Sequence, residues 1–406
     1  MNLSPTTQAI LLLTCHFGQP EQSAERPLSI AEWGRFALWL KKQGDKPADL
    51  LTEQADTILV SWFDTTIPQA RLKALLQRGH SLALAMEKWQ RAGIWVVTRS
   101  DANYPWRLKQ KLKNQAPPVL FGCGNKALLN SGGIAVVGSR NAIDHDLIFT
   151  EQLARQAAFS GYAIVSGGAR GIDTSAMSAA IQSAGRVVGI IADNLLKAAT
   201  SNQWREGLMQ GNLVLLSPFY PESAFSIVNA MARNKYIYCL ADTAIVVHSG
   251  IKGGTWSGAV ENLKHQWTPL WIKSSDDINA GNPGLVDKGG HPLTDQAKDI
   301  DINMLSTAPL SATEQQGVLF PNRDNVDSVS AGRVTDAGSA DEITLDFFQL
   351  FIKKMKQIAR TPKTLDDVVE ETALTKAQAN EWIKKAVQEE ILVKLSHPVR
   401  FQWKQH

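Results

Sequence analysis

The feature that most constrains the fold is a series of apolar runs that alternate with helical stretches in the middle of the chain. In order, these runs read IAVVG, YAIVSGG, RVVGII, NLVLLS, DTAIVVHS and TPLWIK. Strands that are almost continuous in Val, Ile and Leu are typical of a parallel sheet that helices cover on both faces. The pattern therefore predicts an α/β fold with a parallel-sheet core over residues 113–273.

Different patterns flank this core on both sides. Residues 1–112 have helical periodicity, and Trp33, Phe36 and Leu40 recur at spacings of three and four. They predict a helical N-terminal domain with a structural or partner-contact role. Residues 274–341 are rich in Gly, Asp, Asn and Ser, so we expect a flexible linker there.

The last segment, residues 342–406, has three helical stretches followed by the β-like run VRFQWK. This order predicts a winged-helix-like domain, in which the second and third helices form a helix-turn-helix. Lys376, Lys384 and Lys385 stand among glutamates on the third stretch. The two alternatives for this helix are that it reads the groove of duplex DNA, or that it faces solvent or a protein partner.

Composition narrows the class of protein. Apolar residues make up 44% and charged residues 20% of the 406 residues, and the net charge of +3 leaves binding to be argued from local clusters. Cys15, Cys123 and Cys239 lie far apart, so we expect no disulfide or zinc site, no metal and no cofactor. The longest apolar runs are too short to span a bilayer, which favours a cytoplasmic protein.

The first strand is followed by the turn VVGSR. Gly138 allows a sharp turn and the close approach of a ligand, Ser139 offers a hydroxyl, and the Arg140 guanidinium suits a phosphate. A helix that begins near Asp144 would direct its positive end to the same place. The alternative is a connecting turn in which glycine serves geometry alone.

The second strand is followed by VSGGARGID. The small residues Ser166, Gly167 and Gly168 predict backbone N–H groups that converge on one anion. We expect Asp173 to brace this loop. The segment is not a G-x-G-x-x-G motif and the chain has no G-K-[ST] sequence, so neither NAD nor ATP is supported.

Two later segments add donors at the same edge of the sheet. The candidate phosphate-binding residues there are Arg233, Asn234 and Lys235, and, ahead of the next helix, Lys252, Gly253, Gly254 and Thr255. Tyr236 and Tyr238 are expected to pack in the core. Because the carboxyl ends of parallel strands meet at one edge, these loops together predict a site for an anionic ligand, with no catalytic residues.

These motifs resemble the DNA-processing protein DprA (Smf) family. VTRSDANYPWRLKQKLKNQAPPVLFGCGN is similar to its D-x-x-Y-P-x-x-L and P-P-x-L-(F/Y)-x-x-G-N segments, and VVGSR and SGGARGIDTSAMSAAI are similar to its next two motifs. The resemblance implies an extended Rossmann-like core with a helical N-terminal domain and a C-terminal winged helix. It also implies a non-enzymatic homodimer that binds single-stranded DNA and helps load a RecA-like recombinase during natural transformation.

The resemblance carries over to individual positions. Ser139 and Arg140 stand in the family's DNA-contacting V-G-S-R, Gly167 and Gly168 in its phosphate loop, and Arg233, Asn234 and Lys235 at its R-N-R segment. This chain departs from the family at Met177, where the family has His, and at KGGTWSGA, which is closer to the glycine-rich loop of LOG-type proteins. A nucleotide sensor in anti-phage defence and a LOG-like phosphoribohydrolase, with Glu261 as its candidate acid, are therefore the alternatives.

Overall fold

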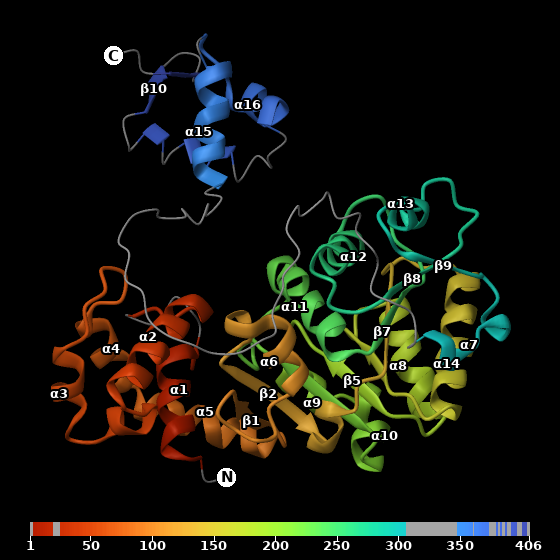
Figure 1. The fold of residues 1–406 in the computed structure, drawn as a ribbon, viewed down its shortest axis with the longest axis horizontal. Helices are drawn as coiled ribbons and strands as arrows, with labels where there is room; N and C mark the ends of the chain where they lie inside the picture. The colour runs from red at the N-terminus through yellow and green to blue at the C-terminus, as the bar shows by residue number, and fades with distance from the viewer. Residues whose placement is uncertain are drawn as a thin grey trace, which may run out of the picture. The chain divides into compact units, whose positions relative to one another are not determined.

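The computed structural model describes most of the chain (Figure 1), namely residues 3–18, 25–305, 347–359, 361–372, 379–380, 382–383, 386–387, 391–395 and 400–403. The chain divides into two compact units, Met1–Leu319 and Phe320–His406. The predicted linker residues 306–341 lie outside the described residues.

The first unit is built around a nine-stranded sheet with the order β1-β2-β6-β5-β4-β3-β7-β8-β9. Its strands are β1 Trp95–Thr98, β2 Val119–Gly124, β3 Ile134–Val137, β4 Ile164–Ser166, β5 Val187–Ile190, β6 Leu213–Ser217, β7 Thr243–Val246, β8 Leu270–Lys273 and β9 His291–Leu293. Neighbouring strands from β6 through β9 are parallel, whereas β1 pairs antiparallel with β2 and β2 with β6. The predicted parallel α/β core is confirmed.

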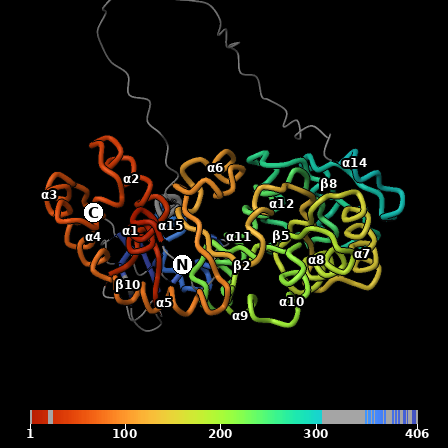
Figure 2. The backbone as a smooth tube through the Cα atoms, turned by 90° about the horizontal axis from the view of Figure 1, so that it is seen from below, coloured from red at the N-terminus to blue at the C-terminus, as the bar shows by residue number. Residues whose placement is uncertain are grey.

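Helices cover both faces of the sheet. Along β3, Ile134 and Val136 join one apolar core and Ala135 and Val137 join the other, because alternate residues of a strand point to opposite faces. The helices that flank the sheet are α6 Trp106–Leu112, α7 Asp144–Phe159, α8 Ile172–Gln182, α9 Leu195–Ala199, α10 Asn202–Gln210, α11 Ile227–Leu240 and α12 Gly254–His265. Residues of α7 and α8 belong to one core and residues of α11 and α12 to the other, and Figure 2 shows these helices around the strands.

The structure corrects two predicted boundaries. The predicted N-terminal domain ended at residue 112, but β1 and α6 belong to the sheet, since Val96 and Val97 are buried where β1 pairs with β2. The predicted linker began at residue 274, but α13 Asn282–Asp287, β9 and α14 Ile302–Leu305 fold onto the core. A few buried apolar side chains, among them Leu285 and Ile302, suffice there because they dock on an existing sheet.

The residues before β1 form a helical layer. Its helices are α1 Pro5–Thr14, α2 Ile30–Gln43, α3 Ala55–Val60, α4 Gln69–Leu76 and α5 Gly79–Arg91. The predicted apolar stripe of α2 is buried at Trp33, Phe36 and Leu40. Ser29 and Glu32 form a capping box that fixes where α2 begins.

The second unit has its own small core. Its described elements are α15 Phe347–Ile358, α16 Leu365–Thr372 and the antiparallel pair β10 Leu392–Leu395 and β11 Arg400–Trp403. Phe351, Met355, Val368 and Phe401 are buried together. These elements match two of the three predicted helices and the predicted final hairpin, whereas most of the third predicted helix, with Lys376, Lys384 and Lys385, lies outside the described residues. No helix in the described ranges is both long enough and apolar enough to cross a bilayer.

Candidate nucleic-acid interface

Two adjoining cavities lie where β3, β4 and β7 end, with volumes of about 420 Å³ and about 480 Å³. They share Arg140, Asn141, Ala169, Ala230 and Arg233, so we treat them as one strand-end cavity. Most of the predicted phosphate-binding residues line it, namely Gly138, Ser139, Arg140, Gly167, Gly168, Arg233, Asn234, Lys252, Gly253, Gly254 and Thr255. The predicted convergence of four loops at one sheet edge is therefore present in the fold.

The turn after β3 places Arg140 at the mouth of this cavity. The backbone N–H of Ser139 donates to the carbonyl of His248 at 2.9 Å, which ties the turn to the end of β7. The Arg140 guanidinium lies 4.9 Å from the centre of the Phe225 ring. A Cβ on Gly138 would lie 2.6 Å from Ile172. Glycine is therefore required here by the packing of α8, in addition to any approach of a ligand.

The structure of the turn after β4 differs from the prediction that its backbone N–H groups bind a phosphate. The Asp173 carboxylate accepts hydrogen bonds from the backbone N–H groups of Gly138, Gly167 and Ala169. Of the three N–H groups predicted to hold a phosphate, that of Gly167 thus already faces a carboxylate of the same chain. Burial raises the pKa of Asp173, and the Arg233 charge and these three N–H groups act against that shift. The predicted bracing role of Asp173 agrees with this geometry.

Two predicted residues do not line the strand-end cavity. Ser166 is fully buried, and its hydroxyl donates to the carbonyl of Val136 at 2.6 Å. The Lys235 ammonium lies 5.3 Å from the centre of the Tyr236 ring and is not among the cavity-lining groups. Ser166 is absent from the cavity because it belongs to β4 and faces the core. Lys235 is absent because it lies on a different face of α11 from the cavity-lining residues.

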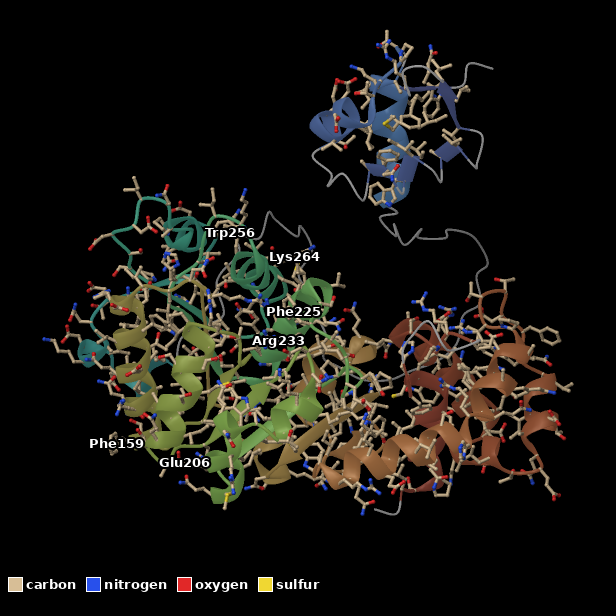
Figure 3. The ribbon with its side chains drawn as sticks, turned by 180° about the vertical axis from the view of Figure 1, so that it is seen from behind. Phe159, Glu206, Phe225, Arg233, Trp256 and Lys264 are labelled. Carbon is tan, nitrogen blue, oxygen red and sulfur yellow. The ribbon has the colours of Figure 1, made fainter. Side chains whose placement is uncertain are left out.

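Arg233, in the middle of α11, is a structural support for the cavity floor. It is 4% exposed, and its guanidinium donates to the carbonyl oxygens of Gly167 and Ile190. Burial lowers the pKa of Arg233, while Asp173 counteracts that shift. Figure 3 shows Arg233 and Phe225 in the same region of the molecule. Arg233 thus holds the ends of β4 and β5 in place.

The loop after β7 supplies a helix N-terminus. Gly253 has a φ of +105° and caps α12, whose first residue is Gly254. The first backbone N–H groups of an α-helix have no partner within the helix and carry its positive end. Thr255 donates from its hydroxyl to the carbonyl of Gly138 at 3.0 Å, which fixes this end beside the first turn. The exposed Lys252 stands next to it.

Sequence reasoning missed an apolar rim on this cavity. Phe225, Ile227 and Met231 line it and are 52%, 69% and 45% exposed. They come from the loop before α11 and from the first turns of that helix. Apolar residues at a helix start that face no buried partner are the signal that could have found them.

Burial tests the packing predicted for two tyrosines of α11. Tyr236 and Tyr238 are 4% and 1% exposed, so their predicted packing role is confirmed, although Tyr238 also forms part of the cavity wall. Met177 is fully buried and packs against Gly189. Glu261 is not among the residues that line the strand-end cavity. No group of three or more potential metal ligands is found in the described part of the chain.

The fold and the cavity define an α/β protein of Rossmann-like topology with a cavity, lined in part by cationic side chains, at the carboxyl ends of its strands. Residues 95–304 match the family model described as DNA recombination-mediator protein A. This match runs from β1 to α14, over half of the chain, and the chain belongs to that family.

Curated relatives agree with this assignment. The chain is 29% identical over 238 residues to the DNA processing protein DprA of Bacillus subtilis, across 58% of this chain and 80% of that protein. It is 31% identical over 197 residues to DprA of Streptococcus pneumoniae, across 48% of this chain and 69% of that protein. The crystal structure of the Streptococcus pneumoniae protein matches the fold with a TM-score of 0.55 at 20% identity, across 74% of this chain and 97% of that chain.

Proposed function

We propose that this chain binds single-stranded DNA in the strand-end cavity and acts in DNA recombination without catalysis. The observation that carries the proposal is the meeting of cationic groups and exposed apolar side chains around one cavity. Membership of the recombination-mediator family gives the ligand class. The joint presence of charge and apolar surface is what single-stranded nucleic acid requires.

The phosphates are assigned to the cationic side of the cavity. Arg140 and Lys252 line it, together with the N-terminal end of α12 at Gly254 and Thr255. The Gly167 amide is not assigned to a phosphate, because it faces Asp173. Phosphate contacts of this kind make affinity fall as salt concentration rises.

The bases are assigned to the apolar rim. Phe225 presents a half-exposed ring beside Arg140, and Ile227 and Met231 continue the apolar surface. A base stacks on such a surface by its face, which any of the four bases offers. In duplex DNA these faces are already stacked, so the rim favours single strands and tolerates sequence changes.

The two alternatives, a LOG-like phosphoribohydrolase and a nucleotide sensor, have less support. A phosphoribohydrolase needs an acid at the ligand, and Glu261 is not among the residues that line the cavity. A free nucleotide would be too small to contact both the whole strand-end cavity and its apolar rim. Homodimer formation, delivery of DNA to a RecA-like recombinase and a role in natural transformation are proposals that come from the family, whereas a role in anti-phage defence is proposed from the departures at Met177 and KGGTWSGA.

The test is a competition measured by fluorescence anisotropy on the full chain. A labelled oligothymidylate is bound first and then displaced with unlabelled single strand, duplex or nucleoside monophosphate over a range of salt. We expect displacement by the single strand alone at comparable concentrations, with affinity falling as salt rises. Equal displacement by duplex or by a mononucleotide, or affinity independent of salt, would contradict the proposal.

A further inference from the structure

A second cationic surface lies beside the strand-end cavity, between α5 of the helical layer and α9 of the sheet unit. We call it the α5–α9 groove. It is an open depression of about 390 Å³, and Lys88, Arg91, Asn194, Lys197 and Thr200 line it. Its lining contains three cationic residues, the polar Asn194 and Thr200, and the apolar Ala92 and Leu196. Cationic heads beside apolar surface suit the backbone of a polyanion rather than a metal ion.

The groove is continuous with the strand-end cavity along the chain. Ala192 and Asp193 line the cavity, and the next residue, Asn194, lines the groove. The Asn194 side chain accepts the backbone N–H of Lys197 at 2.8 Å, which sets the position of that lysine on α9. The cavity and the groove are therefore lined by consecutive residues, Asp193 and Asn194.

Packing fixes the groove relative to the apolar rim. The loop before α11, which carries Phe225, touches both walls of the groove. Its Tyr220 ring lies 6.2 Å from that of Trp89 on α5, and its Pro221 carbonyl accepts the N–H of Leu196 at 2.9 Å. Glu222 of the same loop forms an ion pair with Lys88. The helical layer and the cavity are thus held in one geometry, as a continuous binding path requires.

The cations of the groove are accessible to a ligand. Arg91 pairs with Glu87 one helical turn away, and both side chains are more than half exposed. Exposed pairs of this type contribute little to stability, so a phosphate oxygen can replace the carboxylate. The exposed Lys197 ammonium forms no ion pair with any described residue.

We propose that the α5–α9 groove is a second subsite for the phosphodiester backbone of the same single strand. The inference rests on the proposed function and adds a path to it: the strand passes from the cavity over residues 192–194 and α9 and onto α5. It gives the helical layer a direct part in binding. It also predicts that affinity rises with strand length beyond what the cavity alone holds.

The test compares two double charge reversals in the full chain. The groove variant is Arg91→Glu with Lys197→Glu, and the control is Arg155→Glu with Lys264→Glu. The control makes the same change in net charge, breaks a similar pair with Glu151 one turn away on α7, and touches none of the cavities above. Affinities are measured for oligothymidylates of about 4 and about 16 nucleotides, the range of site sizes in single-strand binders.

We expect the groove variant to bind the long strand about 25-fold more weakly at about 0.1 M salt, with the salt slope reduced by about 1.4, the values for two lost phosphate contacts. Its affinity for the short strand should equal that of the control. If both variants lose long-strand affinity equally, the groove is not a subsite, although the proposed function stands. If the wild-type chain binds neither strand, the proposed function fails and the inference fails with it.

Discussion

The Arg233 guanidinium occupies the space in which a Cβ on Gly167 would lie, and it donates to the Gly167 carbonyl. Such a Cβ would be 1.9 Å from Arg233 Nη1. The buried Arg233 of α11 therefore explains why the motif VSGGARGID has a glycine at position 167. This contact joins the β4 turn to the helix behind it and sets the shape of the strand-end cavity.

Gly167→Ala should lower the free energy of unfolding by about 3 kcal/mol, because the added methyl group must displace a buried charged side chain. Gly34→Ala is the matched control. Gly34 lies within α2 and has no atom near its Cβ position, so alanine there should stabilise the protein by about 1 kcal/mol. Chemical denaturation measures both values, and equal effects of the two substitutions would contradict the packing described.

Arg140→Ala should weaken binding of oligothymidylate about fivefold at about 0.1 M salt and reduce the salt slope by about 0.7, as expected for one lost phosphate contact. The contact with Phe225 is lost as well, since the guanidinium lies over that ring. Arg155→Ala, on the surface of α7, serves as the control. An Arg140 variant that binds like wild type would remove this residue from the site.

Glu32→Gln should reveal a pH-dependent contribution to stability from the helical layer. Arg71 donates to Glu32 at 2.8 Å, and with the Ser29 N–H it lowers the pKa of Glu32 to about 2. The charged form is favoured in the folded state, so its contribution is complete above the usual pKa of 4.5 and is lost as pH falls through about 2.

The substitution should therefore lower the free energy of unfolding by about 2 kcal/mol at neutral pH, the range for hydrogen bonds to a charged group. The difference from wild type should shrink below pH 4.5. Urea unfolding at a series of pH values tests this expectation. A difference that stays constant down to pH 3 would show that the Glu32 charge has no part in it.

The cysteines should be unreactive in the folded protein. Cys15, Cys123 and Cys239 are all buried, and burial raises the pKa of each thiol to about 12. Because the thiolate is the reactive form, Ellman's reagent should give no signal at pH 8 until the protein is denatured. Fast reaction of even one thiol in the native protein would contradict the burial seen here.

The sequence predicted the parallel core because strands buried on both faces leave a clear apolar signature, as at Ile134–Val137. Most of the site followed from it, since parallel strands bring their carboxyl ends together. Two features could not be predicted because they depend on contacts between segments that are distant in the sequence. The Asp173 carboxylate faces the Gly138 N–H of the β3 turn as well as the loop that it was predicted to brace, and Phe225 meets Arg140 only through the fold. The edge strand β9 was missed because its short, polar sequence folds only against β8.

Hydrogen–deuterium exchange of the full chain, with and without saturating single-stranded DNA, tests the location of the binding site most directly. We predict slower exchange in peptides that cover residues 138–141, 167–170, 225–231 and 250–255, which contain residues that line the strand-end cavity. Unchanged exchange in these four segments, with protection confined to residues 347–403, would contradict it.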